Sequence, residues 1–239
     1  ARHAARCVER HAYDLRRLER LLDADDLGDA YLRLTAVRSS EGDLDGVERL
    51  ARMYTAWTRR RGMEATVLDD RRATHDFEDS ITLAIEGAGA HALLAREAGL
   101  HKLRRDLGGG RHASELVRVE VFPAPHDGGV GIASEVRAEA RPLRDAAGRL
   151  VTTLRSDVRL LHRPPMTSLR AWSPKAGTDA SEPLTGFLAA VLAASAAPHS
   201  DVVRASGFGP SSVIRDRRRG RSTGRVARVL GGARHLVAD

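Results

Sequence analysis

Strand-like and helix-like stretches follow one another along this chain without a regular rhythm. Apolar and polar residues alternate over 31–37, 81–85 and 117–121, which is the pattern of half-buried strands. Between the first two stretches, apolar side chains recur at helical spacing, at Leu44, Val47, Leu50, Tyr54 and Trp57. Because no repeated strand–helix–strand unit is visible, we expect a mixed α+β fold rather than a doubly wound sheet.

The remaining stretches complete this expectation. We predict an N-terminal amphipathic helix before residue 23, further strands over 64–68, 136–140, 158–161 and 169–172, and helices over 90–98 and 184–192. Gly62 is expected to end the helix that contains Trp57, and Pro123 and Pro125 mark a domain boundary. Trp57 and Trp172 are expected in the core.

Charge favours a polyanionic partner such as RNA. The formal net charge is +7 and the isoelectric point is about 10.5. However, Lys102 and Lys175 are the only lysines among 39 basic residues, so a skewed composition is an alternative explanation. Cys7 is the single cysteine, and no paired spacing of metal ligands occurs. We therefore expect no metal, no cofactor, no membrane span and a cytoplasmic location.

The chain contains no glutamine and no asparagine. It therefore cannot contain any motif that requires one of these two residues intact.

A set of motifs, in order, resembles the type 2 bacterial class I peptide chain release factors. These motifs are LARMYTAWTRRRG (50–62), IEGAGAHALLAREAGLHKLRR (85–105), RHAS (111–114), VEVFP (119–123), SDVRLLHRP (156–164), IRDRRRG (214–220), STGRV (222–226) and VLGG (229–232). The resemblance implies a decoding body made from two non-adjacent segments, 28–125 and 201–239. It also implies a small α+β domain over 126–200, the former catalytic domain, and an N-terminal helix remnant over 1–27.

The catalytic end of that family is a Gly-Gly-Gln loop that cuts peptidyl-tRNA. The alignment places it at Ala147, Gly148 and Arg149, where no glutamine stands. We favour a simple hairpin turn there, because a long cation replaces the amide that positions water at the ester. The run Arg204–Gly209 also resembles the segment before that glutamine, but it aligns as well with the C-terminal segment, which we prefer.

The segments that would read the stop codon also lack the family's characteristic residues. Family members read stop codons with a Ser-Pro-Phe loop, and here only residues 106–110 join Arg105 to Arg111. A family threonine corresponds to Ala113, and a family glutamate falls on Gly42. Since phosphate contacts alone do not specify bases, codon specificity should be lost.

Candidate RNA contacts remain in two groups. One comprises Arg104, Arg105, Arg111, His112 and Ser114, and the other comprises Arg215, Arg217, Arg218, Arg219, Arg221 and Arg225. The resemblance thus implies a monomeric protein that binds ribosomes or other structured RNA without efficient stop-codon reading or hydrolysis. It would act by occupying, protecting or regulating the ribosomal A site. Alternatives are codon-independent peptidyl-tRNA hydrolysis in ribosome rescue, RNA binding away from ribosomes, and a scaffold whose arginines only keep it in solution.

Overall fold

The computed structural model describes residues 27–39, 45–71, 79–125, 132–144, 150–162, 167–174, 181–194, 202–208, 213–218 and 220–231. Its strands are β1 Ala30–Ser39, β2 Glu64–Asp70, β3 Ser80–Glu86, β4 Gly99–Gly108, β5 Arg111–Pro123, β6 Ile132–Arg144, β7 Leu150–His162, β8 Thr167–Ser173, β9 Val202–Phe208, β10 Val213–Asp216 and β11 Arg221–Thr223. Its helices are α2 Gly46–Arg60, α3 Ala90–Leu94, α4 Ser181–Ala193 and α5 Val226–Leu230, with a 3₁₀ turn, η2, at Ala95–Glu97. The mixture confirms the α+β class.

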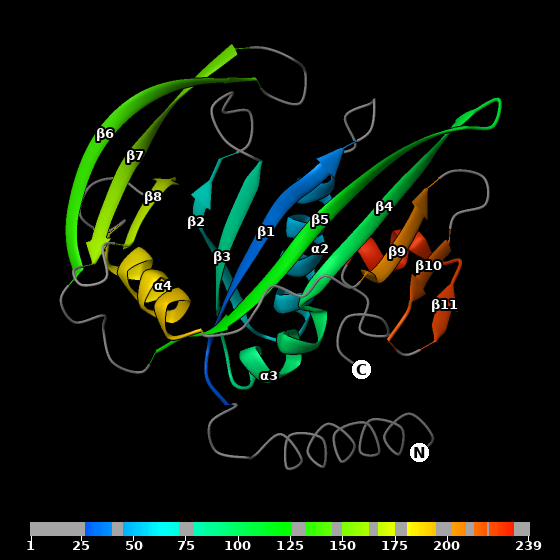
Figure 1. Ribbon diagram of the computed structural model, residues 1–239, viewed down its shortest axis with the longest axis horizontal. Coiled ribbons are helices and arrows are strands. Elements are labelled where there is room, and N and C mark those ends of the chain that lie inside the picture. The colour runs from blue at the N-terminus through cyan, green and yellow to red at the C-terminus, as the bar shows by residue number, and fades with distance from the viewer. Residues whose placement is uncertain are drawn as a thin grey trace, which may run out of the picture.

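One eight-stranded sheet contains strands from both ends of the described chain. Its strand order is β11-β10-β9-β4-β5-β1-β3-β2. Strand β9 lies parallel to β4, and the other neighbouring pairs are antiparallel. The segment after residue 201 therefore completes the sheet begun by residues 30–123, and the expected body made from two non-adjacent segments is confirmed (Figure 1).

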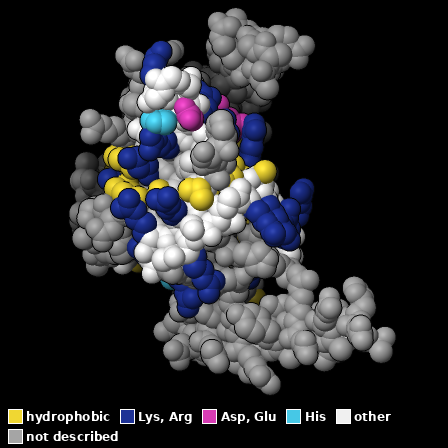
Figure 2. All heavy atoms as spheres, turned by 90° about the vertical axis from the view of Figure 1, so that its right-hand side faces the viewer, with side chains coloured by type: hydrophobic (Ala, Val, Ile, Leu, Met, Phe, Trp, Pro, Cys, Tyr) yellow, Lys and Arg dark blue, Asp and Glu magenta, His cyan; other side chains and the backbone are white. Residues whose placement is uncertain are grey.

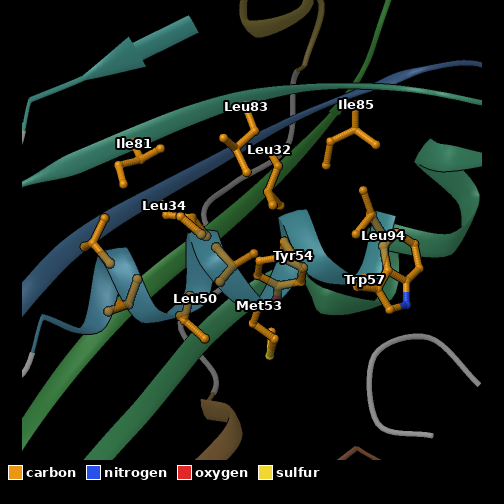
Figure 3. Close-up of a cluster of buried hydrophobic side chains, with 14 of the residues drawn as sticks. Leu32, Leu34, Leu50, Met53, Tyr54, Trp57, Ile81, Leu83, Ile85 and Leu94 are labelled. Atoms are coloured by element: carbon orange, nitrogen blue, oxygen red, sulfur yellow. The ribbon is translucent and has the colours of Figure 1, made fainter. Parts of the chain in front are cut away.

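The inner face of this sheet packs against helix α2 (Figure 3). The helical spacing of Leu50, Met53, Tyr54 and Trp57 places these four side chains on one face, and each is at most 2% exposed. They meet Leu32, Leu34, Ile81, Leu83 and Ile85 of the sheet. Both tryptophans are buried as expected, since Trp57 and Trp172 are 0% and 1% exposed.

Glycines mark both ends of α2. At its start, the Gly46 N–H donates to Oε2 of Glu115 at 2.9 Å, and a β-carbon at Gly46 would collide with that carboxylate. After its end, Gly62 has a φ of 71°, a left-handed conformation that glycine adopts without steric cost. The predicted helix end at Gly62 is confirmed.

A second, three-stranded sheet, β6-β7-β8, and helix α4 cover part of the outer face of the large sheet (Figure 1). Phe187 of α4 lies edge-on to Tyr31 and Phe122 of the large sheet, with ring centroids 5.6 and 5.7 Å apart. Val158, Leu160 and Ala171 of the small sheet belong to the same buried cluster.

Several sequence predictions needed correction. The helix expected over 90–98 is only α3 followed by η2, and β4 begins immediately afterwards at Gly99. Strands β4, β9, β10 and β11 were not predicted. The predicted N-terminal helix lies outside the described residues. Within the described part of the chain, no helix is long and apolar enough to cross a bilayer.

Candidate functional site

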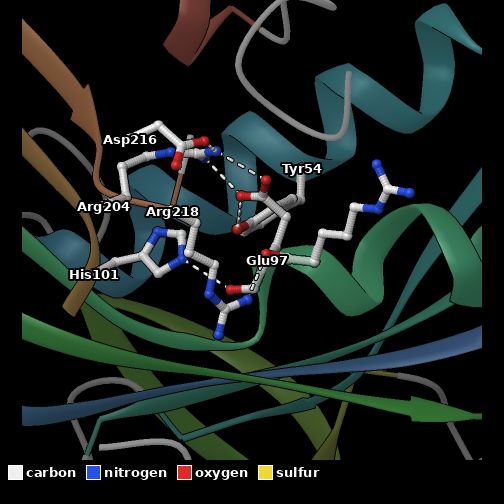
Figure 4. A network of polar contacts seen from close by, with 7 residues as sticks. Tyr54, Glu97, His101, Arg204, Asp216 and Arg218 are labelled. Atoms are coloured by element: carbon white, nitrogen blue, oxygen red, sulfur yellow. Dashed lines mark hydrogen bonds and ion pairs between the residues drawn. The ribbon is translucent and has the colours of Figure 1, made fainter. Parts of the chain in front are cut away.

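A buried ion pair joins the two segments of the large sheet (Figure 4). Arg204 on β9 donates through Nη2 to Oε1 of Glu97 at 2.8 Å, and its Nη1 lies 2.6 Å from Oε2. Asp216 on β10 adds a carboxylate oxygen 3.9 Å from Nη2. The three residues are 1%, 3% and 5% exposed. The C-terminal segment is thus fixed to the rest of the sheet by charge as well as by strand pairing.

Tyr54 and His101 complete this cluster, which we call the junction network. The Tyr54 hydroxyl donates to Oε2 of Glu97 at 3.1 Å. Burial, and then the neighbouring Glu97 carboxylate, raise the pKa of Tyr54 well above its ordinary value. Burial alone would lower the pKa of Arg204, but Glu97, Tyr54 and Asp216 raise it. Arg204 therefore stays charged.

His101 is held neutral in the junction network. Its Nε2 lies 3.0 Å from the backbone carbonyl oxygen of Glu97. Because a carbonyl only accepts, Nε2 carries the hydrogen. Burial, reinforced by the charges of Arg204 and Arg218, lowers the pKa of His101 to about 3. His101 is a structural residue of this network.

The strand β9 excludes one of the two alignments of the run Arg204–Gly209. Residues 202–208 form a strand between β4 and β10, and Arg204 is buried. Residues 204–208 therefore cannot form an exposed loop and belong to the sheet, as the preferred alignment implies.

The tip of the β4–β5 hairpin consists of three glycines and therefore carries no side chains. Gly108, Gly109 and Gly110 have φ values of 80°, 60° and 77°, and nothing lies within 4 Å of a β-carbon placed on any of them. The Gly108 N–H donates to Oδ1 of Asp106 at 2.9 Å. His112 Nδ1 lies 3.8 Å from the same oxygen. The tip is a tight backbone turn and offers only N–H and C=O groups.

The structure brings the two groups of predicted RNA contacts to one end of the same sheet. Arg104, Arg105, Arg111, His112 and Ser114 lie on the β4–β5 hairpin, and Arg215, Arg217, Arg218, Arg221 and Arg225 lie on β10, in the turn after it, on β11 and before α5. Strand β9 lies between the groups. Arg219, and the loop of Ala147, Gly148 and Arg149, lie outside the described residues. Figure 2 shows Lys and Arg side chains gathered on this side of the molecule.

Strand register divides these residues between two faces. Lys102 pairs with Ala205, which pairs with Arg215, so these positions share the outer face. Arg104 lies two residues further along the same face. Arg105 pairs with Phe208 and Arg221 with Asp216, which places both arginines on the opposite, inner side. The predicted residues therefore do not form one continuous surface.

Sequence reasoning missed two basic side chains on the outer face, Lys102 and Arg118. Lys102 is exposed on β4, and Arg118 is half-buried on β5. Once the strands are known, their alternation places both residues there, because Lys102 and Arg104, like Ser114 and Arg118, are separated by even numbers of residues. The sequence alone did not reveal β4, so it gave no signal for Lys102.

A hydrogen bond also connects the two sheets. The Trp172 backbone N–H on β8 donates to Oδ1 of Asp69 on β2 at 2.6 Å, and Arg71 Nε donates to Oδ2 at 2.9 Å. Burial raises the pKa of Asp69 to about 6, although Arg71 and the Trp172 N–H lower it. Within the described residues, no group of three or more potential ligands is arranged to hold a metal ion.

Comparison with known proteins agrees with this architecture. Residues 4–114 match the PCRF domain family. The chain is 32% identical to peptide chain release factor 2 of Phenylobacterium zucineum over 155 residues, which cover 62% of this chain and 42% of that protein. It is 34% identical over 127 residues to peptide chain release factor RF2 of Thermus thermophilus, covering 50% of this chain and 33% of that one. This chain is a release-factor-like protein.

A solved structure shares the fold of this release-factor-like protein. RF2 of Thermus thermophilus superposes with a TM-score of 0.70 and 21% sequence identity, covering 94% of this chain and 71% of that one. In sequence, the chain spans less than half the length of the curated relatives described above. The likeness therefore concerns the fold and the matched segments.

Proposed function

We propose that this release-factor-like protein acts in translation by occupying the ribosomal A site through shape and charge. It does not read stop codons and does not hydrolyse peptidyl-tRNA efficiently. It blocks, protects or regulates the ribosome as a monomer in the cytoplasm and requires no cofactor. The ribosome is its partner, and rRNA phosphates meet its arginines.

The observation that carries this proposal is the hairpin tip at Gly108–Gly110 on an otherwise retained sheet. Recognition of a base requires donors and acceptors aimed at its edge. The family that the sequence resembles carries a Ser-Pro-Phe loop at this position, whereas three glycines in left-handed conformations form the turn here. A backbone turn has no side chain that could distinguish one codon from another.

The composition supports the same conclusion at the catalytic end. Since the chain has no glutamine, no Gly-Gly-Gln loop can be formed. The expected loop position, Ala147–Arg149, retains backbone N–H groups but carries a cation in place of the amide. Loss of one positioned donor from an oxyanion site commonly costs about 100- to 1000-fold in rate.

Support for retained ribosome binding comes from the junction network. A buried pair such as Arg204 and Glu97 is costly to desolvate and strongly destabilising when one partner is lost. Its presence holds β9–β11 against β4 in one arrangement. The two groups of candidate RNA contacts are thereby kept in one sheet, with β9 between them.

Two measurements test the proposal together. The protein is sedimented with purified ribosomes at moderate salt, and peptide release is followed from ribosomes programmed with a stop or a sense codon. We expect co-sedimentation that is independent of the codon, with little release on either. Absence from the ribosomal fraction, or stop-dependent release at the rate of an authentic release factor, contradicts the proposal.

A further inference from the structure

Half of the outer face of the large sheet is left uncovered by the described elements. Helix α4 and the small sheet pack over its β2, β3, β1 and lower β5 portion. Beyond them, the side chains of Lys102, Arg104 and Arg215 are exposed, and Arg118 is half-buried. We call these four residues the open face.

The open face crosses four neighbouring strands, β5, β4, β9 and β10, and the residues at its centre are small. Lys102 and Arg215 flank Ala205, while Arg104 lies beside Gly207. Since neighbouring strands are about 4.8 Å apart, Lys102 and Arg215 project about 10 Å from each other. The small residues on β9 leave a shallow strip between Lys102 and Arg104 on one side and Arg215 on the other.

Asp106 is exposed two residues beyond Arg104 on β4, but within the described residues these cations form no ion pair with an acidic side chain. Arg33, on the covered half of the same face, shows the contrast. Its Nε donates to Oε2 of Glu120 at 2.8 Å, and its guanidinium lies 5.6 Å from the Phe122 ring centroid. Lys102, Arg104 and Arg215 make no such ion pair within the described residues, and the Nε of Arg118 is buried without a hydrogen-bond partner there.

The chemistry of the open face fits a phosphate backbone better than a protein or a lipid surface. Protein interfaces are usually centred on apolar or aromatic anchors. Among the described residues, the exposed large hydrophobic side chains are Val37 and Leu107, and neither belongs to the open face. Guanidinium groups bind phosphates in a bidentate manner, and several of them in rows follow a chain of evenly spaced charges.

We infer that the open face binds the phosphodiester backbone of structured RNA. The RNA lies across β5, β4, β9 and β10, with its phosphates over the strip formed by Ala205 and Gly207. The contact reads charge and shape and not base sequence. This inference deepens the proposed function, on which it rests for the identity of the RNA as ribosomal.

A charge-matched pair of variants tests the inference. The face variant combines Lys102→Gln, Arg104→Gln and Arg215→Gln. The control combines Arg59→Gln, Arg96→Gln and Arg228→Gln, which are equally exposed but lie outside the open face. Each variant loses three positive charges, so a difference between them reports position and not net charge. A thermal melt confirms that both are folded.

Binding is measured with a fluorescent RNA hairpin over a range of salt concentrations, and separately with purified ribosomes. For the hairpin, we expect the face variant to bind at least about 10-fold more weakly, and its plot of log affinity against log salt to be shallower by about 2 to 3. The control should stay within about 3-fold of the wild type, with a slope changed by less than 1.

The outcomes separate this inference from the proposed function. If the wild type binds the hairpin through the open face but does not sediment with ribosomes, the inference stands and the proposed function fails. If the face variant binds hairpin and ribosomes as tightly as the wild type, the inference fails and the proposed function stands. An equal loss in the control, or displacement of the hairpin by polyglutamate of matched charge as readily as by unlabelled RNA, also overturns the inference.

Discussion

Arg204 and Glu97 are 107 residues apart in the sequence, yet their side chains share one buried pair. Strands β9, β10 and β11 have few residues each and contribute little apolar surface. Their buried apolar side chains are Val203 and Ile214, and the following helix α5 adds Val226 and Val229. At the scale of single residues, the attachment of the C-terminal segment therefore depends heavily on one guanidinium.

Replacing Arg204 by Met should lower the free energy of unfolding by about 3–5 kcal/mol, because the buried Glu97 carboxylate would lose its counter-ion. Urea denaturation followed by circular dichroism measures this change. The double variant with Glu97→Leu should recover a large part of the loss, since both charges are then removed. A single variant within about 1 kcal/mol of the wild type would show that the pair contributes little.

His101 should make the protein sensitive to acid. Its pKa is about 3 in the folded protein and near its ordinary value of 6.5 in the unfolded chain. The unfolded chain therefore binds the extra proton first, and the stability present above pH 6.5 is lost as the pH falls from 6.5 toward 3.

The variant His101→Gln tests this prediction, because an amide can still donate to the Glu97 carbonyl but does not titrate. Unfolding free energies of the two proteins are compared at several pH values. We expect the wild type to lose stability relative to the variant as the pH falls from 6.5 to 4. Parallel curves would mean that His101 does not remain neutral in the fold.

At the scale of elements, the contact between α4 and β1 depends on Gly186. A β-carbon at this position would overlap the Tyr31 hydroxyl oxygen. Gly186→Ala should therefore displace the helix and lower the free energy of unfolding by about 1–3 kcal/mol.

The same substitution should become favourable when the hydroxyl is removed. In a Tyr31→Phe background, Gly186→Ala replaces a residue of low helix propensity by one of high propensity. It should then stabilise the protein by up to about 1 kcal/mol. The measurement is a double-mutant cycle from thermal or urea unfolding. If the alanine has the same effect in both backgrounds, the close approach does not limit the packing of α4.

Strands β2 and β8 are joined through the Asp69 carboxylate, whose pKa is raised. The pKa of Asp69 is raised to about 6 in the folded protein, whereas an unfolded aspartate titrates near 3.8. The folded state therefore binds the proton more tightly, and the associated stability is present below pH 3.8 and lost as the pH rises to 6. By this linkage the change is at most about 3 kcal/mol.

Asp69→Asn should abolish that dependence, since the amide oxygen can still accept from the Trp172 N–H. From pH 4 to pH 7, we expect the stability of the wild type to fall relative to the variant. Amide hydrogen exchange at Trp172 would report the same contact locally. A difference between the two proteins that does not change with pH would contradict the raised pKa.

At the scale of the whole molecule, the sequence predicted the parts of the fold that bury apolar side chains in a regular pattern. Strands β1, β3 and β5 and helix α2 alternate or repeat clearly. Strands β4, β9 and β10 do not, because their inward positions carry polar groups. His101, Arg204 and Asp216 point into the core and bind one another or the backbone, so a period of two in hydrophobicity never appears.

The candidate site was predictable in composition but not in arrangement. The arginines of the site could be listed from the sequence. Only the strand register shows that Arg104 and Arg215 share one face of the sheet, while Arg105 and Arg221 lie on the opposite face. Lys102 and Arg118 join the open face for the same reason. The parallel pairing of β9 with β4 connects segments a hundred residues apart, and no local pattern encodes it.

The most direct test of the central claim is a cryo-electron microscopy map of the full chain added to ribosomes that carry either a stop or a sense codon in the A site. We predict A-site density for the large sheet with both codons, with the Gly108–Gly110 turn making no side-chain contact to the codon bases. We also predict that the peptidyl-tRNA remains uncut. Density that appears only with a stop codon, or ribosomes whose A site stays empty at saturating protein, would contradict the claim.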